Sequence, residues 1–196
     1  MKDRLRKQME FILEVDKLKK IGRQTYLSDA SRKENDAEHS WHLALMAVLL
    51  GEHANEKIDI LKVITMVLIH DVVEIDAGDT YAYDEGAKTT QRAREEAAAD
   101  RIFNILPKDQ AEYMRELWEE FEERKTPEAQ FARTLDNAQP VMLNDATDGL
   151  AWREHEVKLS QVMGRNKDTH KGSEDIWKYM EQLFKDNVSK GNLIED

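Results

Sequence analysis

Apolar residues recur at helical spacing along most of this 196-residue chain, and no run of segments shows the alternation typical of strands. The pattern predicts an all-α protein, a bundle of about six to eight helices. We expect a polar connection over 22–35 and assign no element to 147–172. The expected helices are 3–20, a second from Asn35 through Leu49, 58–75, 88–105, a fifth opened by Pro107, a sixth opened by Thr126, and a last one carrying Ile176 to Phe184.

Several helix ends carry a sequence signal. Asn35 is the expected N-cap of the second helix, and Glu38, three residues on, completes a capping box. Thr126 followed by Pro127 opens the sixth helix, because proline suits the first helical position. Gly78 is expected to end the helix over 58–75.

The third helix, over 58–75, is apolar on most sides and is therefore expected at the centre of the fold. His70, Asp71 and Glu74 interrupt it. A buried carboxylate costs several kcal/mol unless it is paired or bound to a metal. The residues alone leave two interpretations open in equal measure. One is a core histidine with surface acids at a helix end, and the other is a metal site.

Two other helices carry similar residues. His39 and His42 lie three residues apart, which is also the spacing of an ordinary partly exposed pair. Asp136 lies within an apolar helical pattern, where pairing with Arg133 would also explain it. Histidines and aspartates from three helices together form a mixed N/O ligand set suited to Mn, Fe, Co, Ni or Zn.

Composition excludes several classes of protein. The chain has no cysteine, so disulfides, thiolate nucleophiles and Cys-based metal sites are ruled out. Its net charge of −11 makes it a poor binder of nucleic-acid polymers or anionic membranes. No apolar segment resembles a signal peptide or a membrane span. We expect one domain over 1–196 and a cytoplasmic location.

The spacing of these residues resembles that of the HD-domain metal-dependent phosphohydrolases over about residues 5–145. The match is closer to the branch of the 5′-deoxynucleotidases. The residues that carry it are Arg23, the run Glu34-Asn35-Asp36-Ala37-Glu38-His39-Ser40, the run His70-Asp71-Val72-Val73-Glu74, Gly78-Asp79 and Asp136.

The resemblance implies a role for each matching residue. Glu74 would activate the attacking water or relay its proton, and Arg23 would bind the phosphate. Asp79 would contribute to catalysis and, with Thr80, contact the sugar. His39, His70, Asp71 and Asp136 would bind one divalent metal ion, which could be Mn, Co, Fe, Ni, Zn or Mg. No histidine lies between His70 and Asp136, which favours one metal over two.

The implied function is release of phosphate from a small nucleotide, most simply a nucleoside 5′-monophosphate, by metal-activated water. Gln24 stands where we expect an aromatic residue, so the choice between ribose and deoxyribose stays open. Other phosphate esters (a nucleoside triphosphate, a cyclic or alarmone nucleotide) and a non-catalytic nucleotide sensor are the alternatives. The resemblance also implies a homodimer. The amphipathic first and last helices would suit one, although an intramolecular core explains them equally well.

Overall fold

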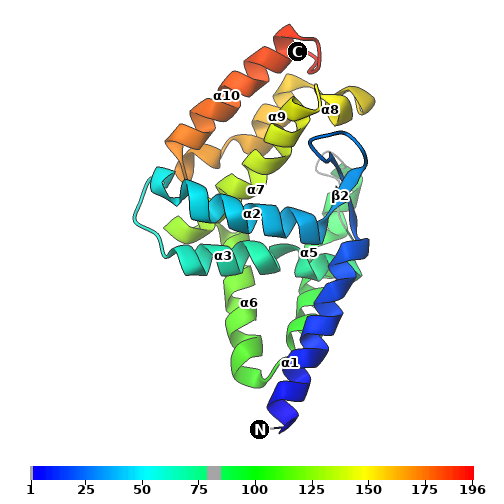
Figure 1. The fold of residues 1–196 in the computed structure, drawn as a ribbon, viewed down its shortest axis with the longest axis vertical. Helices are drawn as coiled ribbons and strands as arrows, with labels where there is room; N and C mark the ends of the chain where they lie inside the picture. Colours follow the sequence, from blue (N-terminus) through cyan, green and yellow to red (C-terminus); the bar gives the residue numbers. More distant parts are fainter. Residues whose placement is uncertain (1, 79–84) are drawn as a thin grey trace.

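The computed structural model describes residues 2–78 and 85–196, which are mostly helical (Figure 1). The all-α prediction is confirmed. No helix in this described part combines the length and apolar character needed to cross a bilayer. The helices are α1 (Lys2–Val15), α2 (Asp36–Leu50), α3 (Ile60–Ile69), α4 (Glu74–Ala77), α5 (Glu85–Phe103), α6 (Lys108–Glu123), α7 (Pro127–Ala146), α8 (Leu150–Glu154), α9 (Leu159–Asn166) and α10 (Glu174–Ser189). Shorter 3-10 turns are η1 (Asp16–Lys20), η2 (Gly51–His53), η3 (His70–Val73) and η4 (Thr169–Lys171).

The predicted polar connection over 22–35 contains a small antiparallel sheet that the sequence pattern missed. Strand β1 (Gly22–Tyr26) pairs with β2 (Lys33–Asn35), with Gly22 opposite Asn35. Segments of five and three residues are too short to show alternation. The sheet matters because it holds Arg23, on β1, beside the start of α2.

The predicted capping box at the start of α2 is confirmed. The Asn35 side chain accepts a hydrogen bond from the Glu38 backbone N–H at 3.0 Å. The Glu38 carboxylate in turn accepts one from the Asn35 backbone N–H at 3.2 Å. These two bonds fix the first turn of the helix, which is the turn that carries His39.

The continuous helix predicted over 58–75 is wrong in its second half. Helix α3 ends at Ile69, and His70 and Asp71 belong to the tighter turn η3 before α4 begins at Glu74. A 3-10 turn has three residues per turn instead of 3.6, so it changes the direction of successive side chains. Apolar periodicity does not distinguish the two kinds of helix. Gly78 does end the segment, with φ of 75°.

Helix α7 is the central element of the fold. It begins as predicted, with the Thr126 hydroxyl accepting a hydrogen bond from the Ala129 N–H at 3.2 Å and Pro127 in the first turn. It packs against α2, α3, α6 and α10, and Phe131 and Leu135 are fully buried. The unassigned stretch 147–172 contains α8, α9 and η4, and α10 packs back on α7 and η4.

Replacing the N-cap of α2 is expected to destabilise the protein. Asn35→Ala removes the side-chain acceptor and should lower the free energy of unfolding by about 0.5–2 kcal/mol. Urea denaturation followed by circular dichroism measures this loss. Asn35→Asp is the matched control, because aspartate caps equally well. Equal midpoints for Asn35→Ala and the unsubstituted protein would contradict the capping role.

Candidate metal centre

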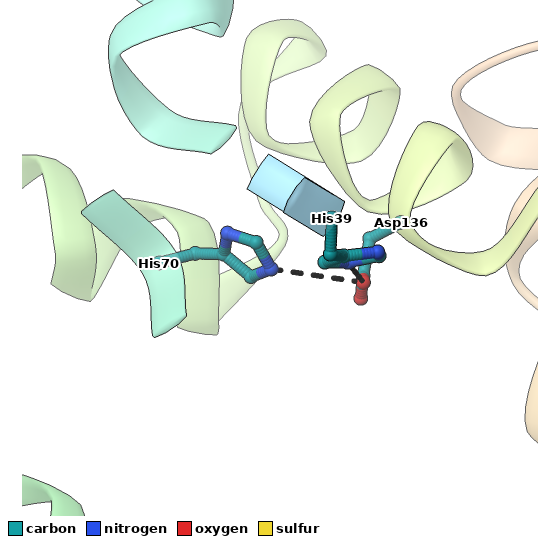
Figure 2. Close-up of side chains that lie close together, drawn as sticks. All are labelled: His39, His70 and Asp136. Carbon is teal, nitrogen blue, oxygen red and sulfur yellow. Dashed lines mark hydrogen bonds and ion pairs between the residues drawn. The ribbon is translucent and has the colours of Figure 1, made fainter. Parts of the chain in front are cut away.

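The residues predicted to bind a metal converge at one buried point. His39 comes from α2, His70 and Asp71 from η3, and Asp136 from α7. Figure 2 shows His39, His70 and Asp136 turned toward one another, and one ligand atom of each lies within 4.8 Å of the others. Asp136 Oδ1 is 3.0 Å from His39 Nε2 and 3.7 Å from His70 Nε2. Asp71 Oδ1 is 3.1 Å from His70 Nε2.

Both imidazoles present the same nitrogen to this point. His70 Nδ1 donates to the main-chain carbonyl of Val67 at 2.9 Å. His39 Nδ1 lies 3.0 Å from the side-chain oxygen of Gln139. A proton on Nδ1 leaves the lone pair of Nε2 available, which is how histidines are held in metal sites.

Each aspartate is held by an arginine on its outer side. Arg23 Nη1 donates to Asp71 Oδ2 at 2.8 Å, and Arg133 Nη1 donates to Asp136 Oδ2 at 2.7 Å. The remaining oxygen of Asp136 faces both histidines, and the remaining oxygen of Asp71 faces His70. The pairing of Asp136 with Arg133 and its place among the histidines are therefore compatible, because each uses a different oxygen.

The electrostatic environment favours positive charge. Burial alone lowers the pKa of His70, but the charge of Asp71 and a hydrogen bond to Asp136 outweigh it and raise the pKa to about 10. Burial and the charge of Arg23 also oppose protonation of His39, yet the hydrogen bond to Asp136 raises its pKa. The field that draws protons to these rings equally favours a cation that competes with them.

The spacing of these atoms suits a single small ion. Ligand atoms around an ion at about 2.1 Å lie about 3.0 Å apart at right angles and about 3.4 Å apart in a tetrahedron. The distances of 3.0, 3.1 and 3.7 Å fall around those values. The residues present therefore fit a divalent metal of the type that accepts imidazole and carboxylate together.

A second group of carboxylates adjoins the first. Asp36, Asp71 and Glu74 lie together and are buried, so the interpretation of Asp71 and Glu74 as surface acids is wrong. Arg23 lies among them, with Nη1 3.2 Å from Asp36 Oδ1 and Nε 3.6 Å from Glu34 Oε1. Sequence reasoning assigned no role to Asp36 or Glu34, although both lie within the run that matched the HD pattern.

A polar cavity of about 90 Å³ opens beside the two groups. Since a water occupies about 30 Å³ in the liquid, the cavity has room for a phosphate-sized group. Arg165, from the stretch that received no assignment, also lines it. The lining residues are Arg23, His70, Asp71, Val73, Glu74, Gln91, Glu95, Trp118, Phe121, Glu122, Arg133, Asp136 and Arg165.

Three residues named from the sequence remain to be placed: Asp79, Thr80 and His42. Asp79 and Thr80, predicted to contact the sugar, lie outside the described residues. His42 is partly buried and lies beside Gln139, whose Nε2 is 3.3 Å from His42 Nδ1. His42 therefore does not lie among the converging ligands, because the side chain of Gln139 lies between it and His39.

The HD domain family matches residues 15–177, which is most of the chain, and the chain belongs to that family.

Particular relatives agree with the assignment. A predicted metal-dependent phosphohydrolase from Magnetospirillum magnetotacticum MS-1 has a crystal structure that is 47% identical with a TM-score of 0.94, covering 98% of this chain and 96% of that one. A conserved hypothetical protein from Pyrococcus furiosus is 25% identical with a TM-score of 0.61, over 92% of this chain and 99% of that one. The human 5′-deoxynucleotidase HDDC2 is 28% identical over 135 residues, which are 68% of this chain and 65% of the relative. The match thus spans slightly less than two thirds of the human protein.

Adding a divalent metal to chelator-treated protein is expected to raise its Tm. At a concentration on the order of 100 Kd, binding adds about 2.7 kcal/mol, a shift of roughly 5–10 °C for a chain of this length. Thermal denaturation with Mn²⁺, Co²⁺, Ni²⁺ or Zn²⁺ measures it. His70→Ala should abolish the shift, and His53→Ala, at an exposed histidine outside the site, should keep it. Equal shifts in both variants would place the metal elsewhere.

Proposed function

We propose that the protein is a metal-dependent phosphohydrolase that releases phosphate from nucleoside 5′-monophosphates. The observation that carries this proposal is a polar cavity lined by His70, Asp71 and Asp136, together with Arg23 and Glu74, with the imidazole of His39 buried directly behind Asp136. Membership of the HD domain family and similarity to proteins named metal-dependent phosphohydrolase and 5′-deoxynucleotidase support it.

His39, His70, Asp71 and Asp136 would hold the metal. When bound there, a divalent ion supplies a Lewis acid for the phosphoryl oxygen and lowers the pKa of water. Arg23 offers a planar, permanently charged group for phosphate oxygens, and its partners Asp36 and Asp71 fix its direction.

Glu74 is the residue we assign to proton transfer. It is buried, lies against Asp71 and faces the cavity. In the proposed reaction its carboxylate accepts a proton from the attacking water and passes it toward the leaving oxygen. Asp79 and Thr80 follow Gly78 directly in sequence, and we assign them to the sugar, with Asp79 also contributing to catalysis.

Removing this carboxylate should separate catalysis from metal binding. Glu74→Gln is expected to lower kcat for phosphate release by about 10²–10⁴-fold, while the metal-induced rise in Tm remains. Glu116→Gln, at an exposed position on α6, is the control and should keep both. A Glu74→Gln variant with full turnover would contradict the assignment, whatever its metal content.

The partner we propose is a second copy of the chain, and the structure offers a surface for it. Helix α1 has no buried residue, and α1 and α2 each expose four large apolar side chains at positions i, i+4, i+7 and i+8. We call these the α1 stripe and the α2 stripe. Helix α1 continues into η1, which packs on α2. The α1 stripe is Leu5, Met9, Ile12 and Leu13, and the α2 stripe is Trp41, Leu45, Val48 and Leu49.

Area and charge both favour a symmetric partner. The exposed apolar surface is large, since each of the eight side chains is 43–71% exposed, and grouped apolar side chains on a surface mark interaction sites. Residues 2–7 carry four basic and one acidic side chain, whereas residues 8–16 carry three acidic and none basic. Two α1 helices packed antiparallel about a two-fold axis near Met9 therefore place opposite charges against each other.

Cross-linking tests this arrangement cleanly because the chain has no cysteine. Met9→Cys should form a covalent dimer with a short bis-maleimide, since the two thiols would face each other at the axis. Tyr179→Cys, on α10 and 57% exposed, should remain uncross-linked at the same concentration. A Met9→Cys variant that stays monomeric, or equal yields from both variants, would contradict the α1 pairing.

A further inference from the structure

The amide of Gln139 lies between a proposed metal ligand and a buried carboxylate. Gln139 is fully buried on α7. Its Oε1 is 3.0 Å from His39 Nδ1, and its Nε2 donates to Glu34 Oε2 at 2.9 Å. The same Nε2 lies 3.3 Å from His42 Nδ1. Both the oxygen and the nitrogen of the amide therefore have polar partners, and no solvent reaches either atom to replace them.

Chemistry decides which way this amide points. An amide nitrogen can donate to the carboxylate of Glu34, whereas an amide oxygen in its place would face another acceptor. Glu34 is itself buried, so such a repulsion would be weakly screened. The oxygen of Gln139 consequently faces His39 and can only accept, which requires the proton of the ring on Nδ1.

The tautomer of His39 has a direct consequence for the metal site. With the proton on Nδ1, the lone pair of Nε2 points toward Asp136 Oδ1, 3.0 Å away, on the side where the proposed metal would bind. His70 obtains the same tautomer from a main-chain carbonyl, that of Val67. Only His39 depends on side chains for it, and those side chains are Gln139 and Glu34.

Glu34 also connects this arrangement to the proposed phosphate-binding residue. Its Oε1 lies 3.6 Å from Arg23 Nε and 3.6 Å from His39 Nδ1. A single buried carboxylate on β2 thus contacts the amide that orients one metal ligand and the guanidinium that lines the cavity.

We propose that Gln139, oriented by Glu34, is a positioning residue that fixes His39 in the tautomer required for metal binding. The inference rests on the proposed metal site. It assigns to Gln139 no contact with substrate. It predicts that the direction of the amide, and not merely the filling of its volume, determines metal affinity.

Metal affinity of the whole chain is the first test. Gln139→Leu keeps the approximate volume but removes the acceptor, and should weaken Zn²⁺ or Mn²⁺ binding by about 10–100-fold. Isothermal titration of chelator-treated protein measures Kd, and circular dichroism of the metal-free form checks folding. The matched control is Asn144→Leu, which removes another buried amide of α7, one bonded to the carbonyl of Pro140. Its Kd should match that of the unsubstituted protein.

Exchanging the two side chains separates orientation from packing. Glu34→Gln alone frees the amide of Gln139 to flip, and Gln139→Glu alone places two carboxylates in contact, so each should bind metal more weakly. The double variant Glu34→Gln/Gln139→Glu restores one carboxylate, one amide and an acceptor facing His39. It should recover most of the lost affinity, which a merely structural role would not produce.

The tautomer itself can be observed. In Zn²⁺-loaded protein with ¹⁵N-labelled histidine, His39 should show its proton on Nδ1, and the double variant should show the same. If the unsubstituted protein binds no divalent metal, the metal-site proposal and this inference both fail. If it binds metal and Gln139→Leu binds equally well, or the double variant is weaker than both single variants, the inference alone is overturned.

Discussion

The burial of negative charge beside two histidines is the constraint on which this structure depends. Glu34, Asp36, Asp71, Glu74 and Asp136 are all buried within the same part of the bundle. Two arginines, Arg23 and Arg133, contact members of this set. Carboxylates without enough positive charge nearby cost several kcal/mol each. A divalent ion at the point where the imidazoles converge would place positive charge next to these buried carboxylates.

The irregular elements of the fold, more than its long helices, position these buried charged side chains and histidines. The capping box starts α2 at the residue that places His39 in the first turn. The change from α3 to η3 turns His70 toward Asp136 on α7 and Asp71 toward Arg23 on β1. The small sheet holds Arg23 against Asp36 and Asp71. The long helices provide the apolar packing that keeps these parts fixed, with α7 in contact with most of them.

The sequence was sufficient for the parts of the site that local spacing encodes. His39, His70, Asp71 and Asp136 were predicted as ligands because their order resembles the HD pattern, whereas the interrupted apolar pattern alone left a metal site and a core histidine equally open. The capping box was predictable because both of its bonds join residues three apart. The two-stranded sheet and the 3-10 turn were missed, because three- to five-residue segments and the difference between 3.0 and 3.6 residues per turn leave no periodic signal.

Contacts between distant residues could not be predicted from the chain alone. Gln139 lies 100 residues from His39 and 105 from Glu34, and only the packing of α7 against α2 and β2 brings them together. Arg133 was predicted as a possible partner for Asp136, but only the folded structure shows that one carboxylate oxygen binds the arginine and the other faces the histidines. Arg165 lines the cavity from a stretch whose pattern predicted no element.

Phosphate release by metal-stripped protein would show whether this site is a metal-dependent phosphohydrolase centre. The protein would be treated with chelator and then given Mn²⁺, Co²⁺, Mg²⁺ or Zn²⁺ in turn, with ribo- and deoxyribonucleoside 5′-monophosphates as substrates. We expect no release without metal, release with at least one metal, and about one bound ion per chain at full activity. Release that persists without metal, or none with any metal despite binding at His39 and His70, would contradict it.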